Sequence, residues 1–149
     1  EMPRSLGDSQ INLSHIDHLF YHDMPNHAHF PTSSSDVQKK IADHVASLID
    51  DGACLQTGIG GIADGVLKNI HNHQHLGGHT EMVSEGAVDL TKKGFVTNTK
   101  KANLPGKKVA SFGLGSNKLY KFMDYNPLID MRDVDYTNDP SNIAMNDKV

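Results

Sequence analysis

The stretch from Ala53 to Ile70 constrains the fold more than any other part of the chain. A short apolar run over 53–56 leads into a glycine-rich turn, Gly58-Ile59-Gly60-Gly61, and then into apolar residues at helical spacing. This order predicts a strand, a turn and a helix. Glycines in such a turn permit positive φ and let a ligand approach the backbone, and the first N–H groups of the helix point toward it. The turn is therefore a candidate anion or oxyanion site.

A second strand is expected around His79 to Val83, after a polar stretch that ends the helix. In a parallel β-α-β unit, the ends of adjacent strands lie side by side. Glu81 is therefore expected to face the glycine turn.

Helical and extended segments alternate along the rest of the chain. We expect a helix over 36–50, because Ser35 and Gln38 form a capping-box pattern ahead of apolar residues at helical spacing. Further expected elements are a short helix over 88–93, a strand over 108–112, a helix capped by Ser116, and an extended stretch over 129–136. This alternation predicts the α/β fold class, with a mostly parallel sheet and flanking helices.

The N-terminal part has a different character. Ile11 and Leu13 alternate as in a strand, but residues 1–22 are too few to fold alone. Over 23–35 the composition shifts to Pro, Asn, His and Ser, which is typical of a solvated connection between two bodies. We interpret 23–35 as a linker.

Composition excludes several classes of partner. The net charge of −4 and the 21% of charged residues indicate neither a disordered tail nor a nucleic-acid-binding surface. No apolar run is long enough to span a bilayer, and no signal peptide is evident, so we expect no membrane partner and a cytoplasmic location. A mitochondrial location is expected if a targeting segment precedes Glu1. The single cysteine, Cys54, is expected to be a buried apolar residue of the first strand.

The glycine turn fits three hypotheses. Gly58, Gly60 and Ala63 match the Gly-x-Gly-x-x-Gly/Ala dinucleotide fingerprint, and Glu81 lies where a ribose-binding acid would follow. A tight turn that serves only packing explains the same glycines. In the third hypothesis Glu81 is a nucleophile that faces a backbone oxyanion site. Spacing alone does not choose among them.

Other candidate residues have simpler explanations. His71, His73, His75 and His79 have a spacing that could hold a divalent metal, but the first three lie in a polar loop, and we expect no metal. His79 is expected to pack at the strand end rather than to orient Glu81. Glu85 is expected to be a solvated acid where a helix begins. The pairs 92–93, 100–101 and 107–108 are lysines, which we expect on the solvated surface, with the phosphates of a bound ligand as an alternative partner for one pair.

Five sequence blocks, in this order, resemble the acetyl-CoA hydrolase/transferase family, and specifically its 4-hydroxybutyrate CoA-transferase branch. They are 2–9 (MPRSLGDS), 55–64 (LQTGIGGIAD), 76–82 (LGGHTEM), 113–120 (GLGSNKLY) and 134–140 (VDYTNDP). The resemblance covers nearly the whole chain but only the middle of a family member. It implies that 1–22 end a first CoA-transferase domain, that 23–35 connect two domains, and that 36–149 begin the second, catalytic domain.

The resemblance also implies an activity and a site. Glu81 would be the covalent nucleophile of a CoA-transferase, and Gly58, Ile59, Gly60 and Gly61 would form part of its oxyanion and acyl site. The substrates would be an acyl-CoA and a small carboxylic acid of the acetate or 4-hydroxybutyrate type, which meet through a glutamyl-CoA thioester.

The same resemblance places Asn138 near the coenzyme or the acyl group, with an Asx turn before Pro140 as the alternative role. It implies coenzyme A as the cofactor and a homo-oligomer as the assembly. Three alternative functions stay open at this point: an acetyl-CoA hydrolase of the same family, a nicotinamide-dinucleotide-binding domain, and an inactive fragment that serves only as a structural module.

Overall fold

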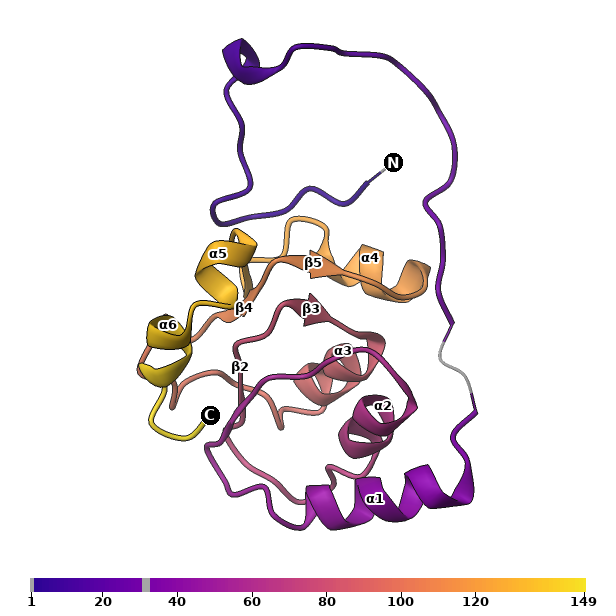
Figure 1. The fold of residues 1–149 in the computed structure, drawn as a ribbon, viewed down its shortest axis with the longest axis vertical. Helices are drawn as coiled ribbons and strands as arrows, with labels where there is room; N and C mark the ends of the chain where they lie inside the picture. Colours follow the sequence, from indigo (N-terminus) through magenta and orange to yellow (C-terminus); the bar gives the residue numbers. More distant parts are fainter. Residues whose placement is uncertain (1, 31–32) are drawn as a thin grey trace.

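A parallel β-sheet forms the centre of the structure, a computed structural model that describes residues 2–30 and 33–149 (Figure 1). Its strands pair in three parallel ladders. These are β1 (Cys54–Leu55) with β2 (Gly77–Gly78), β3 (Met82–Val83) with β5 (Phe112–Gly113), and β4 (Lys108–Ala110) with β6 (Ile129–Met131). A parallel bridge between His79 and Val109 joins the first ladder to the others.

Both central strands of this sheet are interrupted at the same level. β2 and β3 are separated by 79–81, and β4 and β5 are separated by Ser111. The main-chain oxygen of Glu81 accepts hydrogen bonds from the N–H groups of Ser111 and Phe112, at 2.8 and 3.0 Å. The predicted α/β class with a parallel sheet is confirmed, but the strands expected over 79–83 and 108–112 are each broken in two.

Four helices form one layer against the sheet. They are α1 (Asp36–Ala46), α2 (Gly61–Lys68), α3 (Glu85–Lys92) and α4 (Asn117–Met123). The last three each connect neighbouring parallel strands, and right-handed crossovers place such helices on one face. α1 packs on α2, α2 on α3 and α3 on α4. The short helices α5 (Val134–Thr137) and α6 (Pro140–Ala144) lie across the strands from this layer (Figure 1).

Local sequence explains where the helices begin and end. The Ser35–Gln38 capping box is present as predicted, and the Ser116 hydroxyl caps α4. α1 ends at Ala46 rather than at Asp50, because the next N–H groups bond three residues back in tight turns that direct the chain into β1.

Two other predicted boundaries are wrong. α3 begins at Glu85, three residues before the expected start at Val88. The extended stretch predicted over 129–136 is a strand only as far as Met131, because the N–H groups of Thr137 and Asn138 bond back to Asp133 and Val134 and close the helical turn α5.

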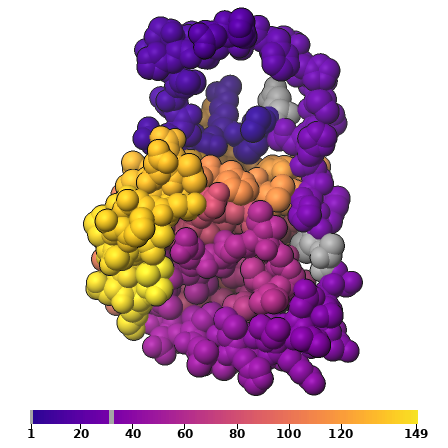
Figure 2. Space-filling model, in the orientation of Figure 1, coloured from indigo at the N-terminus to yellow at the C-terminus, as the bar shows by residue number. Residues whose placement is uncertain are grey.

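The N-terminal segment contacts the body near its start, over 4–8, and again at 27–29, and between these it extends away from the body (Figures 1 and 2). Residues 6–8 run beside β6, where Gly7 bridges Met131 in parallel. The strand expected at Ile11 and Leu13 is wrong, since both side chains are exposed and a short 3-10 turn, Leu13–His15, occurs there instead. Of the predicted linker, residues 23–30 and 33–34 contain no helix or strand, and 31–32 lie outside the described residues. The three-part division of the chain stays a prediction.

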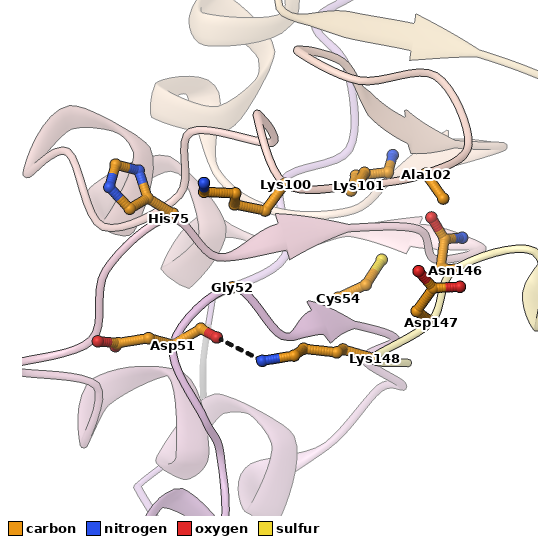
Figure 3. A pocket seen from close by; sticks show the side chains of 10 residues that line it. All are labelled: Asp51, Gly52, Cys54, His75, Lys100, Lys101, Ala102, Asn146, Asp147 and Lys148. Atoms are coloured by element: carbon orange, nitrogen blue, oxygen red, sulfur yellow. Dashed lines mark hydrogen bonds between the residues drawn. The ribbon is translucent and has the colours of Figure 1, made fainter.

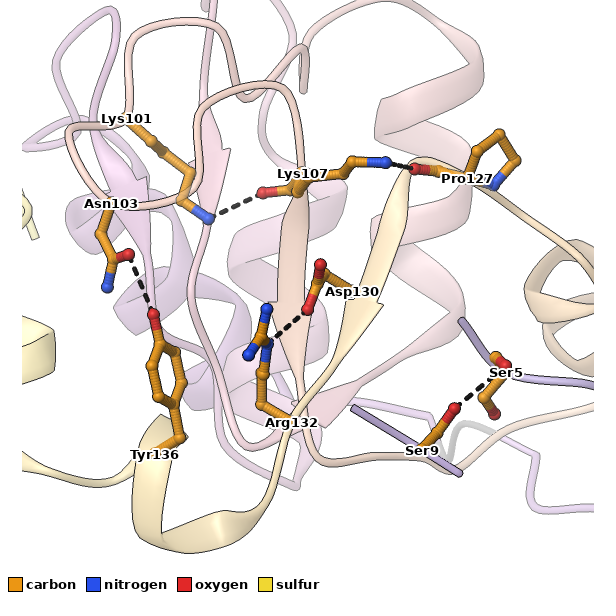
Figure 4. A network of polar contacts seen from close by, with 9 residues as sticks. All are labelled: Ser5, Ser9, Lys101, Asn103, Lys107, Pro127, Asp130, Arg132 and Tyr136. Carbon is orange, nitrogen blue, oxygen red and sulfur yellow. Dashed lines mark hydrogen bonds and ion pairs between the residues drawn. The ribbon is translucent and has the colours of Figure 1, made fainter. Parts of the chain in front are cut away.

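Two buried lysines contradict the expectation that the lysine pairs are solvated. Lys101 and Lys108 are 5% and 7% exposed. The Lys101 ammonium donates to the carbonyl oxygens of Gly78 at 2.9 Å and Lys107 at 2.7 Å, the second of which is drawn in Figure 4. Glycine makes the space, because a Cβ on Gly77 would lie 2.5 Å from Lys101 Cγ and one on Gly78 would lie 2.8 Å from Lys108 Nζ. The other members of the pairs are exposed or half-buried.

Apolar packing on the helical side of the sheet fixes these strands. Val83, Val88 and Leu119 belong to one buried cluster, and Leu67 and Leu76 belong to a second. Cys54 is buried and has a free thiol, as predicted, and burial raises the pKa of that thiol. No helix within the described part of the chain combines the length and apolar character needed to cross a membrane.

Candidate active site

Glu81 lies at the break in the central strands. Its main-chain oxygen accepts hydrogen bonds from the N–H groups of Ser111 and Phe112, while its side chain is exposed. One carboxylate oxygen, Oε2, accepts a hydrogen bond from the side-chain amide of Asn138 at 3.1 Å. Asn138 follows α5 directly, so the helical turn that the sequence did not predict delivers this amide to Glu81.

A chain of hydroxyl groups supports the amide. The Thr137 hydroxyl lies 2.6 Å from the Ser111 hydroxyl and donates to Asn138 Oδ1 at 3.4 Å. Ser111 in turn donates its N–H to the main-chain oxygen of Glu81. Both ends of Glu81 are therefore connected to one network. The position near the coenzyme or the acyl group that the resemblance implies for Asn138 stays a prediction, and the contact with Glu81 is an addition to it.

His79 packs beneath this network, as predicted. It is fully buried, its Nε2 lies 3.1 Å from the Thr137 main-chain oxygen, and its ring stacks on Tyr136 with centroids 6.1 Å apart. Burial lowers the pKa of His79, which favours the neutral imidazole. Both of these contacts join His79 to α5, and neither involves the Glu81 carboxylate.

The glycine turn is open to solvent. Gly60 has a φ of 130°, a conformation that favours glycine, and a Cβ on Gly58 or Gly60 would meet no atom within 4 Å. Ile59 is 65% exposed between them. Gly61 begins α2, so the turn leads directly into the N-terminal end of a helix, which attracts anions.

A buried threonine joins the glycine turn to the Glu81 strand. Thr80 Oγ1 donates to the Thr57 main-chain oxygen at 2.8 Å and accepts from the Thr57 N–H at 3.1 Å. Thr57 directly precedes Gly58, and Thr80 directly precedes Glu81. One hydroxyl therefore sets the position of the turn relative to the carboxylate. Sequence reasoning missed Thr80, because its contact lies 23 residues away along the chain.

A small cavity of about 50 Å³ adjoins the turn. The residues that line it include Ile59, Gly60, Asp64, Met82, Ser84 and Glu85. It therefore brings together two predicted turn residues and the segment that follows Glu81. Glu85 begins α3, but it is half-buried rather than solvated as predicted, and its Oε2 accepts a hydrogen bond from the Ser116 N–H at 3.2 Å.

The histidine series does not form a cluster. His71 and His75 are exposed in the loop, and His79 is buried on the strand. Across residues 2–30 and 33–149, no three side chains of His, Cys, Asp or Glu lie close enough together to hold a metal ion.

A larger cavity, of about 360 Å³, lies at the opposite end of the strands (Figure 3). Residues that precede β1 and β4 line it, among them Gly52 and Lys100, and Cys54 lies at its floor. The Lys148 ammonium donates to the main-chain oxygen of Asp51 across its edge, at 3.3 Å. Glu81, the glycine turn and Asn138 do not line this cavity, whereas the pair Lys100 and Lys101 does.

Comparison with known proteins identifies relatives of the whole chain. The model of the acetyl-CoA hydrolase/transferase C-terminal domain matches residues 115–149. The chain is 45% identical over 148 residues to a 4-hydroxybutyrate coenzyme A transferase of Clostridium kluyveri, with 99% of this chain and 34% of that protein covered. It is 44% identical to a succinyl-CoA:acetate/propanoyl-CoA:succinate CoA transferase of Fasciola hepatica, with 99% and 31% covered.

Solved structures give the same result. A 4-hydroxybutyrate CoA-transferase from Porphyromonas gingivalis superposes with a TM-score of 0.90 at 40% identity, over 97% of this chain and 37% of that one. RipA from Yersinia pestis superposes with a TM-score of 0.88 at 35% identity, over 97% of this chain and 34% of that one. The chain thus spans about a third of the length of these relatives. By sequence and by fold, the chain is similar over nearly its whole length to one segment of proteins of the acetyl-CoA hydrolase/transferase family.

Proposed function

We propose that the protein is a CoA-transferase that moves coenzyme A between an acyl-CoA and a small carboxylic acid, with Glu81 as the covalent nucleophile. The observation that carries the proposal is the position of Glu81. Its carboxylate is exposed at a break in two parallel strands, is held by the Asn138 amide, and is linked through Thr80 to an open glycine turn. The names of the relatives support CoA chemistry over dinucleotide binding.

The first half of the reaction forms an anhydride. With Oε2 held by Asn138, the other carboxylate oxygen attacks the thioester carbonyl of the acyl-CoA, the carbon–sulfur bond breaks, and the CoA thiolate leaves. The thiolate then attacks the Glu81 carbonyl carbon of the mixed anhydride. This breaks the carbon–oxygen bond, releases the donor acid as its carboxylate, and leaves a glutamyl-CoA thioester. No proton is gained or lost in either step.

The second half is the same exchange in reverse. The carboxylate of the acceptor acid attacks the glutamyl carbonyl carbon, the carbon–sulfur bond breaks, and a new mixed anhydride forms as the CoA thiolate leaves. The thiolate then attacks the acceptor's carbonyl carbon, which breaks the carbon–oxygen bond, gives the new acyl-CoA and releases the Glu81 carboxylate. Every step passes through a tetrahedral oxyanion, for which the backbone N–H groups of the turn Gly58, Ile59, Gly60 and Gly61 are the proposed donors. A donor of this kind contributes about 3 kcal/mol to the transition state. In this scheme coenzyme A is the group that is transferred, and it leaves and returns as its thiolate.

Replacing Glu81 by Gln tests this proposal, because the amide keeps the size and hydrogen bonding of the side chain but lacks a nucleophilic oxygen. We expect transfer from acetyl-CoA to a carboxylate acceptor to be abolished while the melting temperature stays within a few degrees of the parent protein. Retained turnover in Glu81→Gln contradicts the assignment. Measuring CoA release with and without the acceptor separates transfer from the hydrolase activity that the family name also includes.

The resemblance also predicts a homo-oligomer. Gel filtration with light scattering tests that prediction independently of the chemistry.

A further inference from the structure

The N-terminal ends of α2 and α3 meet at the small cavity beside the glycine turn. Gly60 is the N-cap of α2 and Ser84 is the N-cap of α3, and both line the cavity. Neither helix has a side-chain cap. Both helices have eight residues, and their first N–H groups and dipoles favour an electronegative group placed between them.

The Ser84 hydroxyl points to a ligand in this cavity. A serine at an N-cap normally accepts a hydrogen bond from the first turn of its helix, but Ser84 does not. The residue is only 5% exposed, and within the described part of the chain its Oγ has no hydrogen-bond partner. A buried hydroxyl without a partner costs free energy, which a polar group in the cavity would recover.

The charges around the cavity define which polar group fits. The carboxylates of Asp64 and Glu85 line the same cavity, and Glu85 is held there by the Ser116 N–H at 3.2 Å. These two negative charges repel a second carboxylate on a substrate. They can, however, accept a hydrogen bond from a neutral hydroxyl, as can Ser84 Oγ. An apolar end would leave Ser84 unpaired.

The size of the cavity limits the chain that enters it. A volume of about 50 Å³ admits only a few water-sized groups, since each needs roughly 10–15 Å³ by this measure. Rings and long chains are therefore too large. The cavity suits the end of a short, unbranched chain.

We propose that this cavity is the subsite for the far end of the acyl group, and that Ser84 determines specificity there by recognising a terminal hydroxyl. The inference rests on the proposed function, because Ile59 and Gly60 belong both to the cavity and to the oxyanion turn. Met82, the residue after Glu81, also lines it. Glu81 itself does not line the cavity, so in this proposal an acyl chain bound at its carboxylate runs past the turn toward Ser84.

The test compares two acceptor acids that differ only at the far end, 4-hydroxybutyrate and butyrate. We expect the parent protein to use 4-hydroxybutyrate with a kcat/KM roughly three- to tenfold above that of butyrate, which corresponds to one hydrogen bond. In Ser84→Ala this ratio falls toward one. The control is Ser47→Ala, which removes a serine hydroxyl near the end of α1, where it bonds the His44 main-chain oxygen. The control keeps the parent ratio.

A purely structural role for Ser84 predicts a different result, because both acids then lose activity equally and the ratio does not change. That outcome overturns the inference, as does a parent ratio of one. Succinate provides a second check. It is expected to be a poor acceptor, and Asp64→Asn is expected to raise its use relative to butyrate.

Equilibrium binding separates this inference from the proposed function. NMR titration of the parent protein and of Ser84→Ala with 4-hydroxybutyrate and with butyrate requires no turnover. If the parent protein transfers no CoA, the proposed function fails. The subsite is still supported in that case if the parent protein binds 4-hydroxybutyrate more tightly than butyrate and Ser84→Ala binds the two acids equally. Equal binding of the two acids by the parent protein overturns the inference.

Discussion

Replacing Lys108 by Met should stabilise the protein, and by more at pH 7 than at pH 9. Burial, and then the neighbouring Lys101 ammonium, lower the pKa of Lys108 from 10.5 to about 8. The unfolded chain therefore binds this proton more tightly than the folded chain does. A lysine whose pKa is lowered on folding destabilises the fold below pH 8, and this penalty disappears as the pH rises toward 10.5.

The size of the effect follows from these two values. A shift of one pKa unit corresponds to 1.36 kcal/mol. The burial of Lys108 therefore lowers the free energy of unfolding by about 3 kcal/mol at pH 7 and by about 2 kcal/mol at pH 9. Met is unbranched and apolar and fills the space of the lysine stem beside Gly78, so Lys108→Met removes this cost with little loss of packing.

Urea unfolding at pH 7 and pH 9 measures the difference between Lys108→Met and the parent protein. The Cys54 thiol and Lys101 are present in both proteins, so those parts of their titrations that do not depend on Lys108 cancel in this difference. Lys93→Met, on the exposed end of α3, is the control and should change the free energy of unfolding by less than about 0.5 kcal/mol. A Lys108→Met protein that is less stable than its parent, or whose gain does not shrink at pH 9, refutes the reasoning.

Three further predictions concern the contacts around the site. Thr80→Val removes the hydroxyl that bonds the N–H and the carbonyl oxygen of Thr57, so it should lower the free energy of unfolding by about 1–3 kcal/mol and slow thioester formation. Thr80→Ser keeps the hydroxyl and should keep the stability and the rate of the parent protein. Equal rates for the Val and Ser proteins contradict a positioning role. Gly77→Ala should destabilise by about 1–3 kcal/mol in thermal unfolding, because its Cβ would lie 2.5 Å from Lys101 Cγ, and a neutral result would show that the lysine stem moves aside. Asn138→Ala should lower kcat about tenfold or more with little change in melting temperature, since the amide is exposed and bonds the Glu81 carboxylate; an unchanged kcat excludes it from the site.

The sequence predicted those features of the site that depend on neighbouring residues. The strand, glycine turn and helix around Gly60 follow from local spacing, and so does the capping box at Ser35. The position of Glu81 at the end of β2 follows from the same β-α-β pattern. These features need no knowledge of distant parts of the chain.

Other features depend on distant contacts and could not be predicted. The main-chain oxygen of Glu81 bonds across to Ser111 and Phe112 at the break in both strands, which no periodicity signals. The lysines at 101 and 108 look like surface residues locally, and only the space left by the diglycine of β2 explains their burial. The Ser84 hydroxyl that lacks a hydrogen-bond partner could not be predicted either, because its surroundings depend on how the N-terminal ends of α2 and α3 meet in the fold.

Detection of a covalent glutamyl thioester tests the central claim most directly. The protein is incubated with acetyl-CoA, treated with borohydride and analysed by intact mass and peptide mapping. Borohydride reduces a glutamyl-CoA thioester to an alcohol, so the account predicts a mass change that maps to Glu81 and is absent without acetyl-CoA. A protein that transfers CoA but carries no modification at Glu81, or carries one at another residue, contradicts the account.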